Sequence, residues 1–242
     1  MSSTALAATT TPAAETGCLV CGADLVYLAE SVPMTCALCG ATHASAARCA
    51  AGHYACDACH ASPAKDLIER TCAATEETDP VALAVRLMHH PSVKMHGPEH
   101  HFLVPAVLLA TFSNARGEPG RRAARVAEAR RRTEPLCGGF CGIQGACGAG
   151  IGTGTFVAIA SGSTPVKGPE RGLSNRMTAR ALDVISRTDG PRCCKRDSFL
   201  AILAAARFVR EHLGVALPAR GPACEWSGTN AECIGDACPF HR

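Results

Sequence analysis

The sequence predicts a mainly α-helical protein in two parts, a small cysteine-rich module followed by a larger helical domain. Between residues 18 and 60 the chain holds seven cysteines and only short apolar runs, so this segment cannot build a hydrophobic core of its own. From residue 79 onward apolar residues recur at helical spacing, and no alternating strand pattern of any length is present. With 242 residues, 47% of them apolar, the chain is long enough to bury a core.

The composition restricts the class of protein. The formal net charge of +3 is small, and the clearest basic run, Arg121 to Arg132, is interrupted by Glu128, which disfavours a nucleic-acid partner. No apolar run reaches the length that a membrane span requires. The first residues lack the basic and apolar regions of a secretory signal, which predicts a cytoplasmic protein. In that reducing compartment the 16 cysteines are expected to be metal ligands or catalytic groups rather than disulfides.

The amino-terminal part carries ligands for two metal sites. Residues 1–16 have no periodicity and predict a disordered tail. Residues 17–60 form a predicted zinc-binding module, since cysteines separated by two residues supply the thiolates that Zn²⁺ prefers in structural sites. The two sites are arranged either in series or interleaved as a cross-brace, and His43 or His60 is an alternative to one ligand. The eight predicted ligands are Cys18, Cys21, Cys36, Cys39, Cys49, His53, Cys56 and Cys59.

This module resembles zinc-ribbon and RING-like modules, most specifically in the segment CAAGHYACDAC that begins at Cys49. It departs from the full RING pattern because no further cysteine pair with this spacing follows Cys59, which argues against ubiquitin-ligase chemistry. Every position of both sites is filled by a protein ligand, so we expect the zinc to fold the module rather than to catalyse a reaction. The module is then expected to dock a protein partner.

The helices of the larger part follow in chain order. Residues 61–78 are predicted to be a connector with some helix, and the helical cysteine-rich domain covers residues 79–242. Asp79 followed by Pro80 starts its first helix, with the aspartate as N-cap, and Gly214 ends its last one. The helices between are predicted at Val104–Phe112, Pro119–Thr133, Ala146–Ala160, Ser174–Ser186 and Ser198–Leu213.

The cysteines of this domain indicate an iron-sulfur cluster. From Cys137 to Gly154 the chain reads CGGFCGIQGACGAGIGTG, with three cysteines and eight glycines. Glycine-rich loops let backbone N–H groups approach the sulfurs of a cluster. Cys72 is isolated and is expected to be an ordinary buried thiol. The irregular spacing leaves the ligands open among Cys137, Cys141, Cys147, Cys193, Cys194, Cys224, Cys233 and Cys238.

A family resemblance narrows this choice. The segment CGAGIGTGTFVAIASGST from Cys147, then LSNRMTARALDVI, then GPRCC, is similar in order to the carboxy-terminal region of iron-sulfur-dependent L-cysteine desulfidases and L-serine dehydratases. VPAVLLATF, from Val104, resembles the proline-containing helix of those dehydratases. The resemblance implies a [4Fe-4S] cluster with one iron free of protein thiolate, which polarises the leaving group of the substrate while a base removes the α-proton. Its implied ligands are Cys147 and Cys193 or Cys194, completed from the last three cysteines, and the preferred set is Cys147, Cys194, Cys233 and Cys238.

A histidine-rich segment supplies candidate acid–base groups. Residues 88–101 read MHHPSVKMHGPEHH and hold five of the ten histidines. His96, Glu99, His100 and His101 are candidates for the general base or for binding a substrate carboxylate, because they precede an apolar helix whose amino-terminal end attracts anions. A purely structural role is the alternative.

Together these patterns predict a mainly α fold, a helical iron-sulfur domain preceded by a small zinc-bound module, with one [4Fe-4S] cluster and two Zn²⁺. The predicted function is an enzyme of lyase or sulfur-handling type that acts on a small polar substrate. The alternative is a non-catalytic metal-binding protein for electron transfer or partner docking. An open iron separates the two, since an electron carrier is usually ligated by protein throughout.

Overall fold

The computed structural model describes residues 18, 23–37 and 41–242, without the side chains of residues 58, 59, 61 and 62. The predicted disordered tail, residues 1–16, lies outside the described residues. Contacts divide the chain into two compact units, Met1–Cys59 and His60–Arg242. Each unit is described by itself.

The amino-terminal unit is built on a β-hairpin. Strand β1 (Leu25–Thr35) pairs antiparallel with β2 (Thr42–Cys49), and the register is irregular between Tyr27 and Val32. Most hairpin residues are exposed, and the buried apolar residues described in this unit are Met34, Cys36, Cys49 and Cys56. Three of these four are cysteines, so the described part of the unit lacks a conventional apolar core. A fold of this size needs another source of stability.

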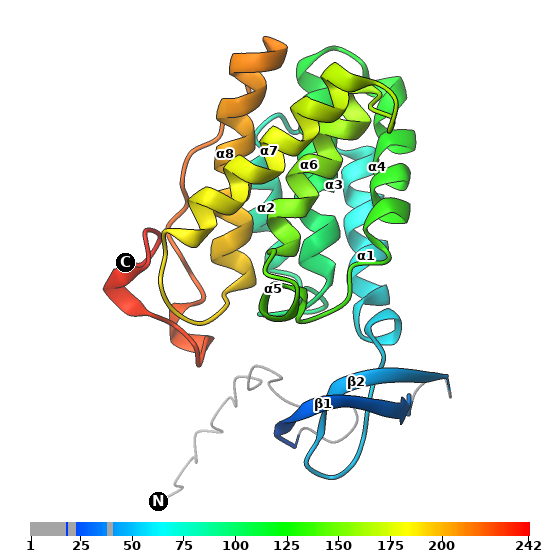
Figure 1. Ribbon diagram of the computed structural model, residues 1–242. Helices are drawn as coiled ribbons and strands as arrows, with labels where there is room; N and C mark the ends of the chain where they lie inside the picture. The colour runs from blue at the N-terminus through cyan, green and yellow to red at the C-terminus, as the bar shows by residue number, and fades with distance from the viewer. Residues whose placement is uncertain (1–17, 19–22, 38–40) are drawn as a thin grey trace, which may run out of the picture. The chain divides into compact units, whose positions relative to one another are not determined.

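The second unit confirms the mainly helical prediction (Figure 1). Two short 3-10 turns, η1 (Ser227–Thr229) and η2 (Gly235–Ala237), interrupt an otherwise irregular carboxy-terminal segment. The helices are α1 (Asp57–Ala74), α2 (Pro80–Met88), α3 (Glu99–Ala115), α4 (Pro119–Thr133), α5 (Phe140–Ile143), α6 (Gly148–Ser161), α7 (Gly168–Ser186) and α8 (Cys194–Leu213).

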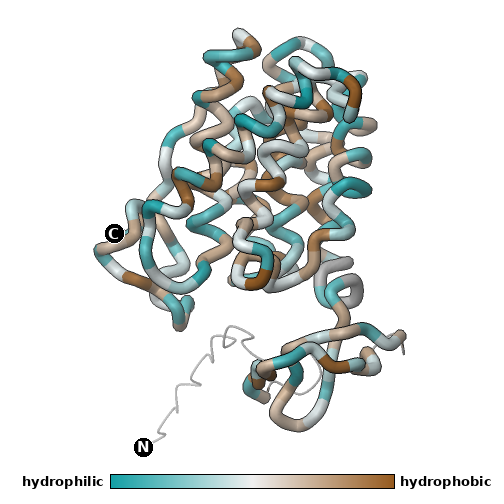
Figure 2. The backbone as a smooth tube through the Cα atoms, in the orientation of Figure 1, coloured by the Kyte–Doolittle hydropathy of each residue, from teal (hydrophilic) through white to brown (hydrophobic). Residues whose placement is uncertain are grey.

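Helix α3 is the centre of this unit. Every residue from Glu99 to Ser113 is buried, and α3 packs against α2, α4, α6 and α8. A helix that is apolar on all sides is expected to be surrounded by others. In Figure 2 hydrophilic and hydrophobic positions alternate along the outer helices, as expected for helices with one solvent-facing side.

Several helix ends follow from local chemistry. Asp79 Oδ1 accepts hydrogen bonds from the amides of Val81 and Ala82 at 2.8 and 3.1 Å, so it is the predicted N-cap of α2. Gly214 ends α8 with φ at 67°, a conformation that glycine adopts without steric cost. α4 has the predicted bounds.

The helical unit begins earlier than the predicted boundary at residue 79. Helix α1 fills most of the expected connector, and its residues Ala64, Ile68 and Cys72 belong to the hydrophobic core of the helical unit. Cys72 is fully buried, and burial raises the pKa of its thiol. The division between the units falls between Cys59 and His60, next to the predicted end of the zinc-binding module at residue 60.

Glycines of α6 allow its close approach to α3 and α7, with which it makes extensive contacts. A Cβ atom at Gly154 would lie 1.9 Å from Thr178 Oγ1 and 3.2 Å from the carbonyl oxygen of Ser174 in α7. A Cβ at Gly152 would lie 2.8 Å from Cδ of Pro105 in α3. The small residues that the sequence places after Cys147 are therefore required by helix packing.

The arginines of α4 are largely engaged within the unit. Arg125 donates to Glu118 Oε2 at 2.7 Å and to Ser113 Oγ at 2.9 Å. Arg130 pairs with Asp66 and Glu69 of α1. Much of the basic run is consequently used for packing α4 against neighbouring helices. Arg131 and Arg132 of this run pair with Glu128 of the same helix, and Arg122 donates to Asn114.

In the part of the chain that the structure describes, no helix combines the length and apolarity that crossing a membrane requires.

Candidate functional site

A group of ligand atoms in the amino-terminal unit can hold a metal ion. The ligand atoms of Cys18, Cys49 and His53 all lie within 4.8 Å of one another. β2 ends at Cys49, and a turn through Gly52, with φ at 89°, brings His53 back so that the amide of Cys49 donates to its carbonyl at 2.8 Å. Cys49 Sγ then lies 3.9 Å from His53 Nδ1. Two thiols and an imidazole are ligands suited to Zn²⁺.

A second cysteine pair lies in the same unit. Cys36 and Cys56 are both buried, and the amide of Cys56 donates to Cys36 Sγ at 3.2 Å. Cys18 is grouped with Cys49 and His53, whereas Cys36 is grouped with Cys56. Members of the two groups alternate along the chain, which corresponds to the predicted interleaved arrangement and not to two sites in series. The predicted ligands Cys21 and Cys39 and the side chain of Cys59 lie outside the described residues.

The two cysteine loops repeat one backbone feature. The amide of Cys18 donates to the carbonyl of Ala23 at 2.9 Å, and the amide of Cys36 donates to the carbonyl of Ala41 at 2.8 Å. The sequence signal for this repeat is CLVCGA followed by CALCGA. In both loops the first cysteine therefore makes the same backbone hydrogen bond, to the alanine five residues later.

In the helical unit, thiols distant in sequence gather at one end of the bundle. Cys147 is the N-cap residue of α6 and Cys194 is the first residue of α8, and these ends lie near α5, which carries Cys141 (Figure 1). None of the cysteines of this unit forms a disulfide. The amino-terminal ends of two helices favour negative charge beside these thiols.

An open cleft of about 570 Å³ lies beside this first thiol group, Cys141, Cys147 and Cys194. Cys141 and Cys147 line it together with Arg192, Arg196 and Asp197; Gly142, Gly145, Gly190 and residues at the end of α7 complete its wall. The cleft therefore combines soft sulfur ligands with two cationic groups and a carboxylate. Its volume suits a small metabolite.

Burial keeps the thiols of Cys147 and Cys194 protonated unless a positive centre is bound. Burial raises the pKa of Cys147 to about 11, and the carboxylate of Asp197 and the thiol of Cys141 act in the same direction. Burial likewise raises the pKa of Cys194 to about 12, against a backbone hydrogen bond from Gly97, and Cys147 again contributes to the rise. The three thiols are thus electrostatic neighbours.

Three consecutive residues at the start of α8 bring charge into the interior. Lys195, Arg196 and Asp197 are 2, 5 and 6% exposed. Arg196 Nε donates to Asp197 Oδ1 at 3.0 Å, and Cys147 Sγ lies 3.9 Å from Asp197 Oδ2. Buried charges of this kind require partners, and here the partners are one another and the thiol group.

Lys195 is buried beside the thiols of Cys193, Cys194 and Cys224. Its Nζ donates to the carbonyl of Met88 at 3.1 Å and lies 4.5 Å from the ring centroid of Trp226. Burial lowers its pKa to about 8, while Glu99 and the neighbouring thiols of Cys193, Cys194 and Cys224 oppose that change. A positively charged lysine is thus placed next to three thiols that can become thiolates.

The histidine-rich segment packs against the start of α6, next to Cys147. A Cβ on Gly148 would lie 2.1 Å from the ring of His101, so this ring packs directly against the residue after Cys147. His100 is buried, with Nε2 3.0 Å from the carbonyl of Lys94 and Nδ1 3.4 Å from Ser198 Oγ. Burial lowers the pKa of His100 to about 3, so the ring is neutral and its Nε2 donates.

The other two predicted acid–base residues are held in hydrogen bonds as well. Glu99 is fully buried, and its Oε1 accepts from the amide of Lys94 at 2.9 Å. His96 Nε2 contacts Asn230 Oδ1 at 3.1 Å and Glu232 Oε2 at 2.9 Å in the carboxy-terminal segment. Neither the cleft nor the second cavity, described below, has His96, Glu99, His100 or His101 in its lining. Their catalytic role stays a prediction, and their observed contacts are structural.

Seven of the eight predicted cluster ligands are divided between two places. Cys141, Cys147 and Cys194 belong to the cleft group, while a second cavity is lined by Cys193, Cys224, Cys233 and Cys238. Cys137 is exposed and lines neither. The preferred set of the sequence analysis takes two residues from each group. Sequence reasoning missed Arg192, Arg196 and Asp197, because charged residues are normally expected at the surface.

Residues 68–241 match a family of unknown function, DUF5714. The chain belongs to this family. The DUF5714 match contains helices α2 to α8, the cleft and both thiol groups of the helical unit, and it excludes the amino-terminal metal group. No curated protein and no solved structure matches the chain significantly.

Proposed function

We propose that the helical unit is an iron-sulfur enzyme of lyase or sulfur-handling type that acts on a small polar substrate in the cleft. The observation that carries this proposal is the cleft itself, where thiols of one group line the same wall as Arg196 and Asp197. The resemblance to iron-sulfur-dependent desulfidases and dehydratases supplies the reaction class. In this proposal Cys141, Cys147 and Cys194 are the ligands of a [4Fe-4S] cluster.

The donor set suits such a cluster. Cys141 and Cys147 line the cleft, and Cys194 neighbours Cys147. Three thiols are one fewer than a four-iron cluster needs for complete ligation by cysteine. Two of them lie at helix amino termini, where an anionic group is stabilised. Gly148 leaves no Cβ between the first turn of α6 and the ring of His101, so α6 begins deep in the unit.

When bound, the cluster would supply a Lewis-acidic iron that polarises the leaving group of a substrate. The chain's own residues would orient that substrate. Arg192 and Arg196 line the cleft, and guanidinium groups bind carboxylates through paired, charge-assisted hydrogen bonds. Asp197 holds the Arg196 side chain through its 3.0 Å hydrogen bond, while Pro191 accepts from Arg196 Nη2 at 3.1 Å. A substrate that carries a carboxylate, such as an amino acid, fits this arrangement.

The first experiment is metal and acid-labile sulfide analysis of the full chain purified without air. We expect at least about four iron and four sulfide per chain. Cysteine, serine and thiolated metabolites are then added, with release of sulfide, ammonia and keto acid measured and the electron paramagnetic resonance spectrum of the reduced cluster recorded. Product release and a substrate-dependent spectrum support the proposal. A cluster that no candidate substrate perturbs would favour the electron-transfer alternative.

Removing the cleft arginine tests substrate binding. Arg192→Gln is expected to raise the substrate concentration for half-maximal rate by roughly tenfold or more, because one charge-assisted contact is lost. The iron content should not change. Arg187→Gln, at an exposed arginine that pairs with Asp183, is the matched control and should leave the kinetics unaltered. Equal kinetics for the two variants would argue against carboxylate binding by Arg192.

The amino-terminal group is proposed to bind zinc and to serve as a docking module for a protein partner in the cytoplasm. Support comes from the thiol and imidazole ligands of Cys18, Cys49 and His53 at single-ion spacing and from the scarcity of other buried apolar residues in the described part of the unit. Structural zinc commonly provides the folding free energy of such small units.

Changing one ligand of this group tests that role. Cys49→Ser is expected to lower zinc content by about one equivalent and to unfold the hairpin, because metal binding and folding are coupled in small zinc modules. Proteolysis between residues 25 and 49 and zinc analysis report the two effects. Glu30→Gln is the control, since Glu30 is an exposed residue of β1 and is not among the predicted ligands. Unchanged zinc in Cys49→Ser would reject the assignment.

A further inference from the structure

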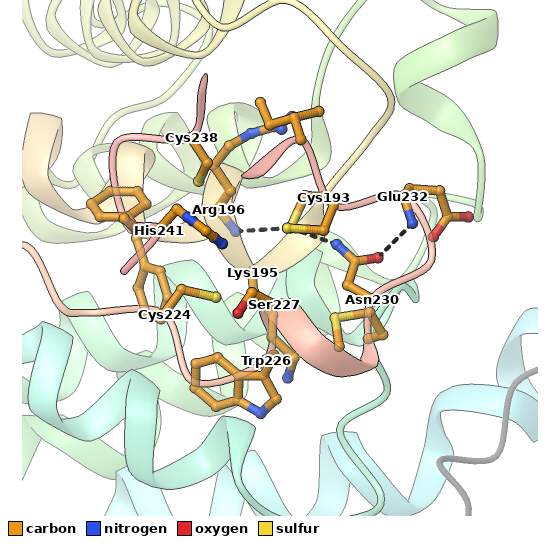
Figure 3. Close-up of a pocket in the computed structure, with 15 residues that line it drawn as sticks. Cys193, Lys195, Arg196, Cys224, Trp226, Ser227, Asn230, Glu232, Cys238 and His241 are labelled. Atoms are coloured by element: carbon orange, nitrogen blue, oxygen red, sulfur yellow. Dashed lines mark hydrogen bonds between the residues drawn. The ribbon is translucent and has the colours of Figure 1, made fainter. Parts of the chain in front are cut away.

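A second thiol group lies apart from the cleft. Cys193, Cys224, Cys233 and Cys238 line one small cavity, of about 20 Å³, together with Trp226, Phe240 and other residues. Figure 3 shows Cys193, Cys224 and Cys238 gathered around this cavity with Lys195 and Trp226. Four thiols around one cavity are a complete donor set for a thiolate-bound metal centre.

The segment that supplies most of these thiols is mainly irregular in structure. Three of the four belong to residues 214–242, which contain only two short 3-10 turns as regular structure. An irregular segment of this length is uncommon in a compact unit without a special function or constraint. Side-chain contacts join it to α8: the ring of Phe240 packs against Phe199 at 5.5 Å between centroids, and Lys195 Nζ lies 4.5 Å from the ring centroid of Trp226. The fourth thiol, Cys193, comes from the N-cap of α8.

Donors already point at the sulfurs of this group. The amide of Gly235 donates to Cys233 Sγ at 3.4 Å, in a turn where Gly235 has φ at 56°. Cys193 Sγ accepts from the amide of Arg196 at 3.5 Å and from Asn230 Nδ2 at 3.7 Å. Hydrogen bonds to ligand sulfurs are the usual outer shell of metal–thiolate centres.

The spacing of the thiols distinguishes a cluster from a single ion. Zinc bound to four thiolates holds their sulfurs about 3.8 Å apart, given Zn–S bonds of about 2.3 Å. Among the described residues, the one group of three or more ligand atoms within 4.8 Å of one another is Cys18, Cys49 and His53. No three of the four thiols of the second group thus lie within 4.8 Å of one another, so the group as a whole is not at the spacing of a single ion. A four-iron cluster places its inorganic core between the cysteines and holds them farther apart.

We infer that Cys193, Cys224, Cys233 and Cys238 bind a second [4Fe-4S] cluster, closed by four protein thiolates and separate from the cleft. It attaches the carboxy-terminal segment to the start of α8. Because all four of its positions are filled, this centre transfers electrons or stabilises the fold and does not bind substrate. The assignment goes beyond the proposed function and does not depend on it.

Iron and sulfide analysis of anaerobic full-length variants tests this assignment. Wild-type protein is expected to contain about eight iron and eight sulfide, and the double variant Cys233→Ala/Cys238→Ala about four of each. Cys137→Ala, which removes an exposed thiol of the same unit, is the matched control and should keep all eight. Mössbauer spectroscopy of the unmodified protein counts the clusters without relying on the folding of a variant, and two four-iron centres are expected.

The outcomes separate this assignment from the proposed function. Iron that is lost in Cys233→Ala/Cys238→Ala but kept in Cys147→Ala belongs to the second group whether or not the cleft cluster exists. Iron lost only in Cys147→Ala would leave the cleft cluster and overturn the second one. A third zinc in place of the second four irons would also overturn it, since the centre would then be a single ion.

Discussion

Cys147→Ala is expected to abolish activity and to remove about four iron and four sulfide from the protein. Cys147 lines the cleft, caps α6 and lies beside both Asp197 and the thiol of Cys194. Loss of a cluster that provides the Lewis acid removes the catalytic group itself, and rate losses of at least about a thousandfold are typical when such a group is removed.

The control for this variant is Cys72→Ala. Cys72 is buried in the core of the same unit, so the substitution also removes one buried sulfur without touching either thiol group. Iron, sulfide and turnover should stay at wild-type values, and far-ultraviolet circular dichroism should show helical structure in both variants. Full iron content and turnover in Cys147→Ala would refute the cleft cluster.

Gly154→Ala is expected to destabilise the helical unit by about 2 kcal/mol, although alanine favours helix more than glycine does. The added methyl group would lie 1.9 Å from Thr178 Oγ1 and 3.2 Å from the carbonyl oxygen of Ser174, so α6 and α7 must separate. The midpoint of thermal unfolding, followed by circular dichroism, should fall by about 4–8 °C.

Gly172→Ala is the matched control in the adjacent helix α7. A Cβ at Gly172 meets no atom within 4 Å, so the helix preference of alanine acts alone and should raise stability by up to about 1 kcal/mol. Opposite signs for the two variants would show that close approach, rather than backbone freedom, explains Gly154. Equal stabilisation of both variants would contradict the observed packing.

Local sequence signals predicted the helices that are governed by local chemistry. Asp79, Pro119 and Gly214 lie at helix ends where their side chains or backbone preferences decide the boundary. α1 was expected only in part, because Pro63 lies inside it and proline normally interrupts a helix. Packing of Ile68 and its neighbours into the core overrides that preference.

The start of α8 shows what a sequence pattern could not reveal. The helix was predicted from Ser198, but it begins at Cys194, because Cys193 caps it and accepts from the amide of Arg196. Charged residues such as those at 195–197 are normally found at the surface. Here they are buried because groups from segments more than forty residues away contact them at the start of α8. Contacts of this kind leave no periodic pattern in the sequence.

The eight candidate thiol ligands could be predicted from the sequence, but their division into two groups in space could not. Cysteine spacing and glycine content indicated that the eight residues bind metal, but spacing along the chain says nothing about which segments meet in space. His96 illustrates the same limit: it contacts Asn230 and Glu232, more than 130 positions later. Only the fold separates the cleft group from the carboxy-terminal group.

Cys193 and Cys194 are joined by one peptide bond, yet Cys193 lines the carboxy-terminal cavity and Cys194 neighbours Cys147. With both centres occupied, this bond is a covalent route for electron tunnelling between them, with no gap through space at the ligands. Charges so close also repel strongly in a buried setting. Adding an electron to one centre would therefore make reduction of the other harder, and the pair would exchange single electrons in sequence rather than two at once.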